Sequence, residues 1–248
     1  MFLVAQISDT HFDGSDHYRD RAQRIMAFVN GLPTPPDAIV VTGDIVDHGL
    51  VAEYEQAREV LQSPIPMLIG PGNHDDRAHF REVLLGETAS TAPINQSLRV
   101  RDVLMLLADS SIPGEPQGAL APETIDWLQG ELDQAPRDTR VLIAFHHPPT
   151  TLFSPIVDPI KLTTIESLAA LVRGDDRIAA VLCGHAHTAA ASIFAGRPLR
   201  IGPSTAATLA PAWESTDGPV VDCAAPPSLA FHVLDGMRVV THFRTVGS

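Results

Sequence analysis

The sequence contains very little cysteine and almost no lysine. Cys183 and Cys223 are its two cysteines in 248 residues, too few for a disulfide-dense secreted fold, so we expect a reducing, cytoplasmic setting; a single bridge between them stays open. Lys161 is the lone lysine, and the net charge is −13. Because proteins bind long nucleic acids by neutralising phosphates with Lys and Arg, this charge balance argues against a long nucleic acid as partner.

Long hydrophobic runs are also absent from the sequence. No stretch approaches the roughly 20 apolar residues that a membrane helix needs, and the N-terminal MFLVAQISD has neither the basic region nor the long apolar run of a signal peptide. We therefore expect no membrane association. The apolar share of 44% and the charged share of 19% are ordinary for a globular protein, so we predict a single packed domain over residues 1–248.

The first third of the chain alternates buried strands with helices. Continuous apolar runs predict strands at 2–7, 38–42 and 66–70, and apolar residues at helical spacing predict helices over 18–32 and 51–61. A strand–helix–strand–helix–strand order indicates a parallel sheet with helices packed on its outside.

The rest of the chain adds short strands in quicker succession. Helices are predicted at 76–85 and 122–132, the second with Pro in its first turn. Further strands are predicted at 98–100, 103–108, 141–145, 178–183, 192–195 and 199–201, with a C-terminal hairpin of 229–234 and 237–243 turning at Asp235-Gly236. We predict an α/β fold, a four-layer α-β-β-α sandwich in which two packed mixed sheets are flanked by helices.

Residues 210–227 differ in composition from the rest of the chain. The segment is rich in Pro and small residues and contains Trp213. A segment of this length and composition favours an irregular loop. The alternative is an insertion that serves as a cap beside the active site or as a dimer contact.

Five short polar clusters each follow a predicted strand. They are Asp9-Thr10-His11, Gly43-Asp44, Gly72-Asn73-His74-Asp75, His146-His147 and Gly184-His185-Ala186-His187. Ligands of open α/β sheets bind at the carboxyl ends of the strands, so we expect these five loops to converge on one site there.

The donor types in these clusters predict a metal site. Imidazole and carboxylate without paired cysteines suit Zn, Fe or Mn better than an iron–sulfur or cysteine-rich structural site. Asp44 has two oxygens with which to bridge two ions, and the Asn73 amide has a carbonyl oxygen for one. Two divalent ions lower the pKa of water and hold the attacking and leaving oxygens of a phosphate ester.

Taken together, the DxH, GD, GNH, HH and GHxH pattern resembles the calcineurin-like metallophosphoesterase superfamily. Within it, the segments ISDTHF, TGDIVDHG, PGNHDD, FHHPP and CGHAHT are most similar to the bacterial class III cyclic-nucleotide phosphodiesterases and the related glycerophosphodiesterases. The resemblance covers residues 9–187. It implies a hydrolase with a binuclear centre of divalent ions (Fe, Mn, Zn or Co), since the ligand types do not select one metal.

The resemblance also implies roles for the matching residues. The first ion would be held by Asp9, His11 and His187, the second by Asn73, His146 and His185, and Asp44 would bridge them. His74 matches a histidine that contacts the phosphate or protonates the leaving group, so Asp44 and His74 are the candidate catalytic residues. We expect His147 to be structural, Asp47 and Asp75 to orient neighbouring histidines or loop amides, and His17, His48, His79, His232 and His242 to lie outside the site.

Departures from the family pattern narrow the range of possible substrates. Serine/threonine phosphatases of this superfamily have an Arg in GDxxDRG and a Glu after GNH, where this chain has His48 and Asp75. We therefore predict in-line attack of a metal-bridging hydroxide on small phosphodiesters, either cyclic nucleotides such as cAMP or glycerophosphodiesters. A phosphomonoesterase acting on nucleotides or sugar phosphates, and a non-catalytic metal-binding scaffold, are the alternatives. Relatives are commonly dimers or larger, so a homo-oligomer stays open.

Overall fold

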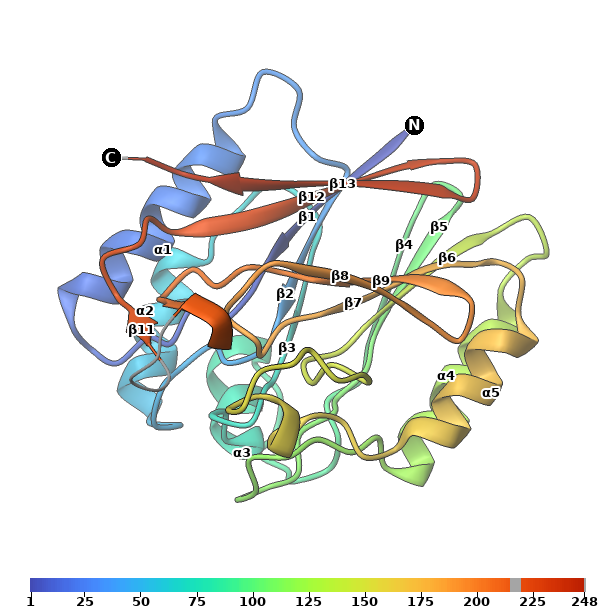
Figure 1. Cartoon of the computed structure of the whole chain (residues 1–248), viewed down its shortest axis with the longest axis horizontal. Coiled ribbons are helices and arrows are strands. Elements are labelled where there is room, and N and C mark those ends of the chain that lie inside the picture. Colours follow the sequence, from blue (N-terminus) through green and yellow to red (C-terminus); the bar gives the residue numbers. More distant parts are fainter. Residues whose placement is uncertain (215–219, 248) are drawn as a thin grey trace.

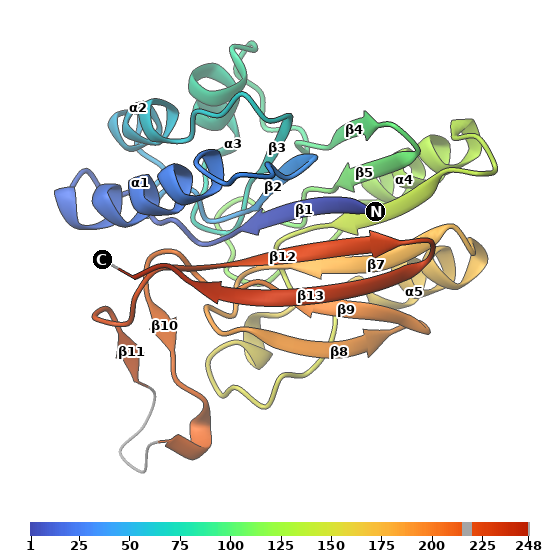
Figure 2. The ribbon, with the colours of Figure 1, turned by 90° about the horizontal axis from the view of Figure 1, so that it is seen from above.

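Two large mixed β-sheets pack face to face, and helices cover both outer faces (Figures 1 and 2). The computed structural model describes residues 1–214 and 220–247. The predicted four-layer sandwich is confirmed. Within the described residues, no helix combines the length and the apolar character that crossing a bilayer requires.

The first sheet contains the parallel strands predicted from the N-terminal part of the chain. Its strands run in the order β13-β12-β1-β2-β3, with β1, β2 and β3 parallel and β12 and β13 antiparallel to their neighbours. Their bounds are β1 Phe2–Ile7, β2 Ala38–Thr42, β3 Met67–Gly70, β12 Ser228–Asp235 and β13 Arg238–Thr245. On its outer side lie α1 (Asp16–Asn30), α2 (Val51–Val60) and α3 (Arg77–Phe80), which continues as a π-helical turn through Leu85.

The second sheet contains the later strands in the order β4-β5-β6-β7-β9-β8. Their bounds are β4 Gln96–Val100, β5 Val103–Leu107, β6 Arg140–Ala144, β7 Ile178–Cys183, β8 Ala190–Phe194 and β9 Arg197–Ile201. Its outer face is covered by α4 (Pro122–Gln134) and by α5 (Ile165–Gly174), which the sequence analysis did not predict.

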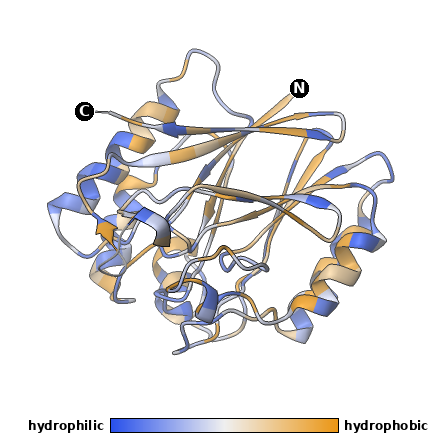
Figure 3. Cartoon of the chain, viewed as in Figure 1, coloured by the Kyte–Doolittle hydropathy of each residue, from blue (hydrophilic) through white to orange (hydrophobic). Residues whose placement is uncertain are grey.

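Three hydrophobic layers hold the sandwich together, and alternate residues of the central strands supply them. In β2, Ala38 and Val40 face the other sheet, whereas Ile39 and Val41 face the helices. The third layer lies between the second sheet and α4 and α5. Figure 3 shows hydrophobic colour along the central strands and both colours on α1, as expected where strands are covered on two faces and helices on one.

A small hairpin arm extends from the body of the molecule (Figure 2). Its strands are β10 (Thr208–Leu209) and β11 (Val221–Asp222), and a 3₁₀ turn at Ala212–Glu214 lies between them. The irregular loop expected at 210–227 is therefore only partly irregular: β11 pairs with residues that directly precede the segment. Residues 215–219 of that prediction lie outside the described residues.

Candidate metal centre

The polar clusters converge because the carboxyl ends of β1, β2, β6 and β7 lie at the same edge of the sandwich. Backbone hydrogen bonds join the loops directly: the Asp9 N–H donates to Gly43 O at 3.1 Å, and the Gly184 N–H donates to His146 O at 3.0 Å. The Gly184–His146 bond joins the ends of the neighbouring parallel strands β7 and β6. The two sheets meet at the same place, where Gly184 packs against Ser8. A Cβ at Gly184 would lie 2.0 Å from Ser8 Oγ, so this close approach requires glycine.

Several candidate ligands have an uncommon backbone conformation. Positive φ values occur at Asp9, His11, Asp44, His185 and His187, between 45° and 68°. Non-glycine residues in the left-handed region are uncommon, and strained backbone of this kind concentrates at functional sites. The strain turns successive short loops so that their side chains meet.

One group of side chains is formed by Asp9, His11, Asp44 and His187. His11 Nε2 lies 3.1 Å from His187 Nε2 and 3.7 Å from Asp44 Oδ2, and His187 Nε2 lies 3.6 Å from Asp9 Oδ1. One ligand atom of each residue lies within 4.8 Å of all the others.

A second group is formed around His146 and His185. His146 Nε2 lies 3.2 Å from His185 Nδ1 and 3.1 Å from Asp44 Oδ2. His147 also has a ring nitrogen within 4.8 Å of this pair, although it is buried and its Nδ1 pairs with Ser110 Oγ at 2.9 Å. Asp44 Oδ2 thus faces both groups, which is the position that a bridging carboxylate requires.

Hydrogen bonds fix which nitrogen of each imidazole faces the cluster. Nδ1 of His11 donates to Asp47 at 2.9 Å, Nδ1 of His146 to Thr42 O at 2.7 Å, and Nδ1 of His187 to Ala207 O at 3.0 Å. In the neutral ring the other nitrogen, Nε2, then has a free lone pair. The Nε2 atoms of His11 and His187 then face each other, a contact that either a shared proton or a bound cation satisfies, and metal-binding histidines characteristically have such a partner on their other nitrogen.

The pKa values of these buried groups also favour a bound cation. Burial lowers the pKa of His187, and it lowers that of His185 to about 3, so both rings are neutral near pH 7. Burial also opposes the charged form of His146, but the Asp44 carboxylate outweighs it and raises the pKa to about 9. Burial favours the neutral form of Asp44, yet the nearby His146 and His11 hold its pKa well below the usual range. An ionised, buried carboxylate among imidazoles attracts a cation.

Asn73 and His74 border the cavity above these groups. The cavity is lined by Asp44, Asn73, His74, Ile156, Val157, Ile160, His185, His187, Leu209 and Val221. Asn73 Oδ1 is buried without a hydrogen-bond partner among the described residues, and such an atom requires an explanation. A divalent ion explains it, since an amide oxygen is a ligand for such ions, so the donor set fits the metals that the sequence implies.

The neighbouring carboxylates position loops and rings. Asp75 accepts hydrogen bonds from the backbone N–H groups of Ile45, Val46 and Gly72, and its burial together with the Asp44 charge raises its pKa to about 6. Asp47 orients His11 and, through its backbone oxygen, accepts from His74 Nδ1 at 2.8 Å. The predicted orienting contacts of Asp47 and Asp75 are confirmed.

The remaining histidines and both cysteines lie apart from the cluster, as expected. His232 is fully buried among strands, whereas His17, His48 and His242 are exposed and His79 is half-buried. Cys183 and Cys223 are free thiols, the first buried and the second exposed.

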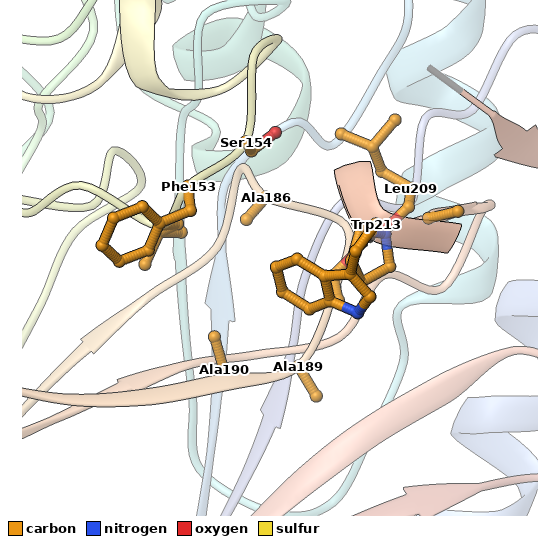
Figure 4. A pocket seen from close by; sticks show the side chains of 11 residues that line it. Phe153, Ser154, Ala186, Ala189, Ala190, Leu209 and Trp213 are labelled. Atoms are coloured by element: carbon orange, nitrogen blue, oxygen red, sulfur yellow. Dashed lines mark hydrogen bonds between the residues drawn. The ribbon is translucent and has the colours of Figure 1, made fainter. Parts of the chain in front are cut away.

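A second cavity, for which the sequence had given no prediction, adjoins the first. This aromatic pocket, shown in Figure 4, is lined by Leu152, Phe153, Ser154, Ala186, Thr188, Ala189, Ala190, Leu209, Ala210, Pro211 and Trp213. Leu209 lines both cavities. The loop at 202–207, whose Ala207 oxygen orients His187, was also overlooked. The strand predicted at 199–201, which ends at Gly202-Pro203-Ser204, was a signal for a sixth loop at this edge.

Comparisons with known proteins agree with this geometry. Residues 2–189 match the family described as calcineurin-like phosphoesterase. A glycerophosphodiester phosphodiesterase from Enterobacter lignolyticus is 34% identical to the chain, covering 97% of it and 90% of the relative. A cAMP/cGMP dual specificity phosphodiesterase from Mycobacterium tuberculosis is 31% identical, covering 84% of the chain and 68% of the relative.

Solved structures share the fold at low sequence identity. A purple acid phosphatase from yellow lupin superposes with a TM-score of 0.68 at 11% identity, covering 99% of this chain and 51% of that one. The inner-membrane-complex anchor GAP50 of Plasmodium superposes with a TM-score of 0.66 at 12% identity, covering 99% and 84%. These likenesses concern the fold alone.

Proposed function

The chain belongs to the calcineurin-like phosphoesterase family, and as a member with phosphodiesterases among its relatives it is a metal-dependent phosphodiesterase. We propose that it hydrolyses small phosphodiesters, cyclic nucleotides or glycerophosphodiesters, with two divalent ions. The position of Asp44 between two groups of histidines carries this proposal, since one carboxylate shared by two ligand groups is what a binuclear centre needs.

The assignment of ligands follows the two groups. Asp9, His11 and His187 would hold one ion, and His146, His185 and Asn73 the other, with Asp44 between them. In this assignment His147 is not a ligand, as its place after His146 in the HH pattern implies; its Nδ1 pairs with Ser110 Oγ, and its Nε2 is buried without a hydrogen-bond partner among the described residues. Bound divalent ions would supply a hydroxide nucleophile near neutral pH and offset the charge that develops on the phosphate.

The chain's own residues perform the remaining steps. The backbone N–H of His74 donates to Asp44 Oδ1 at 3.0 Å, which holds the carboxylate in place. Its ring donates from Nδ1 to Asp47 O, so in the imidazolium form of the ring Nε2 is the atom that would pass its proton to the leaving oxygen and be left with a lone pair. Ile156, Val157 and Ile160 add apolar lining to the same cavity.

The charges around the cavity favour a diester over a monoester. Among the described residues, neither Lys nor Arg lines the cavity above the candidate ligands. A phosphomonoester carries up to two negative charges near pH 7, whereas a phosphodiester carries one. The overall charge of −13 further disfavours the more highly charged substrate.

A substrate panel on one metal-defined preparation tests the proposal. Purified protein would be loaded with Mn, Fe, Co or Zn and assayed with cyclic AMP, glycerophosphoethanolamine, bis(p-nitrophenyl) phosphate and p-nitrophenyl phosphate. We expect turnover of diesters to exceed that of the monoester, with Asp44→Asn as the inactive control. Faster hydrolysis of the monoester would favour a phosphomonoesterase, and no turnover with any metal would favour a non-catalytic scaffold.

A further inference from the structure

The aromatic pocket lies directly beside the proposed reaction site. Ala186, which lines the pocket, stands between the candidate ligands His185 and His187 in the chain, and Leu209 lines both the pocket and the cavity above these ligands. A substituent of a phosphodiester held at the metal centre would reach this pocket past Leu209.

Two large aromatic rings stand exposed at the pocket. Phe153 is 77% exposed and Trp213 is 75% exposed, and Figure 4 shows them on either side of the small side chain of Ala186. Phe153 also has a φ of 60°. A bulky side chain in the left-handed region is an outlier, and such strain concentrates at ligand sites.

The lining of the pocket is apolar and without formal charge. Among the described residues that form it, none is Asp, Glu, Lys or Arg; Ser154 and Thr188 are the polar side chains. A second phosphate group of a substrate would therefore find no Lys or Arg in this lining, and an ammonium headgroup would find no Asp or Glu. The pocket volume of about 130 Å³ is close to that of an apolar cavity of ~150 Å³ that holds a benzene molecule.

We propose that the aromatic pocket binds the base of a nucleotide diester, with Phe153 and Trp213 as stacking partners, so that the enzyme prefers 3′,5′-cyclic nucleotides over glycerophosphodiesters. The proposal rests on the proposed phosphodiesterase function. Stacking of a base on an aromatic side chain strengthens binding by about tenfold or more, and a planar neutral base matches a small apolar pocket flanked by rings. Trp213 would then cover the base from the described part of the hairpin arm, residues 208–214.

The kinetic test compares cyclic AMP with ribose 3′,5′-cyclic phosphate, the same ring without its base. We expect the wild-type protein to prefer cyclic AMP in kcat/KM, and Trp213→Ala to lower that preference about tenfold, with a similar effect of Phe153→Ala. Phe243→Ala removes an exposed aromatic on β13 outside both cavities and should leave both kcat/KM values unchanged.

A binding measurement tests the pocket without turnover. Trp127 and Trp213 are the two tryptophans of the chain, and Trp127 packs against the core from α4. With Trp127→Phe, fluorescence therefore reports on Trp213 alone. We expect AMP to quench this signal and ribose 5-phosphate to leave it unchanged.

The outcomes separate the two proposals. Equal kcat/KM for the two cyclic substrates, an unchanged preference in Trp213→Ala, or equal quenching by both ligands would overturn the base subsite while leaving the phosphodiesterase function in place. No turnover of any diester would overturn the function, and the fluorescence result would still decide the subsite. If Trp213→Ala instead dissociated a dimer seen by size-exclusion chromatography, a second copy would be the occupant and the subsite would be wrong.

Discussion

Asp44 links the two groups of histidines through a single oxygen. Its Oδ2 lies 3.1 Å from His146 and 3.7 Å from His11, and its Oδ1 accepts the His74 N–H. Asn keeps the size and one oxygen acceptor of the side chain but loses the negative charge, and an NH₂ group replaces its other oxygen. The substitution therefore tests the charged carboxylate that the two groups share.

For Asp44→Asn we expect both ions to bind more weakly and kcat to fall by more than ~100-fold, because loss of even an outer partner of a metal ligand typically costs 10–100-fold. Metal content by mass spectrometry and kcat on bis(p-nitrophenyl) phosphate measure the two effects. Asp47→Asn is the matched control: it contacts the cluster only through His11 and His74 and should have the smaller effect. Near-normal turnover of Asp44→Asn would contradict the shared-ligand arrangement.

His74 is more open to solvent than the candidate ligand histidines, with 39% of its side chain exposed, against 21% for His187. We expect His74→Ala to retain both ions and to lose about 10²–10⁴-fold in kcat with an alkoxide leaving group, as in cyclic AMP, because general acid catalysis matters most for poor leaving groups. The loss with bis(p-nitrophenyl) phosphate should be much smaller. His79→Ala, which removes a neighbouring histidine that contacts Gly49 O, is the control. Loss of metal from His74→Ala would make it a ligand instead.

Individual site residues could be predicted from the sequence where a motif followed a strand. Asp9, His11, Asp44, His185 and His187 converge as expected because parallel strands end at a common edge. The partners that orient the rings could not be predicted in the same way. Thr42 and Ala207 act through backbone oxygens, which every residue has, so their identity contains no signal. Phe153 lies in a loop without a motif, and only its backbone conformation and exposure distinguish it.

The hairpin arm is attached to the body through α1. Arg21, which is buried, donates to the backbone oxygens of Thr205 at 2.9 Å, Cys223 at 3.3 Å and Ala225 at 2.6 Å. One side chain therefore joins the helix to the segment that returns from the arm and to the loop beside the metal centre.

We expect Arg21→Ala to lower the free energy of unfolding by about 1–3 kcal/mol, because it leaves a buried carbonyl without its donor, and to make the arm more sensitive to proteases. Urea denaturation and limited proteolysis with mass spectrometry of the fragments measure these effects. Arg24→Ala, one turn along α1 and partly exposed, is the control. Equal cleavage of the arm in both variants would show that Arg21 does not anchor it.

Helices and strands could be predicted from the sequence where the local pattern of apolar residues shows which of their faces are buried. The strands of both sheets and α1, α2 and α4 lie within a few residues of the predicted bounds, because continuous apolar runs and helical spacing reflect burial directly. The small hairpin of β10 and β11 was not predicted, since two-residue strands have no detectable period. Helix α5 has an amphipathic pattern of the usual kind at 165–174, which the sequence analysis did not assign.

The two sheets are joined across their interface by a buried polar network. Gln6 on β1 donates from Nε2 to Thr42 Oγ1 at 3.0 Å and to Cys183 O, on the second sheet, at 2.7 Å. Gln6 Oε1 accepts from Nε2 of His232 at 2.9 Å, and His232 Nδ1 pairs with Thr241 Oγ1. A buried network of this kind stabilises the fold only while every member is paired, so the protonation of His232 affects the contact between the sheets.

Burial, with a smaller contribution from Arg200, lowers the pKa of His232 to about 3, against ~6.5 in an unfolded chain. Between these values the unfolded state binds the extra proton, so stability falls as the pH drops below ~6.5, by about 2 kcal/mol at pH 5.

We expect His232→Asn to lose this part of the pH dependence, measured by urea denaturation at pH 7 and pH 5, whatever its stability at pH 7. Other titrating groups, including the metal-centre histidines, are common to both proteins, so the difference in slope isolates His232. His242→Asn, on the exposed face of the adjacent strand β13, should retain the wild-type slope. A slope in His232→Asn equal to that of the wild-type protein would show that His232 is not the buried neutral histidine that makes the two-sheet contact sensitive to acid.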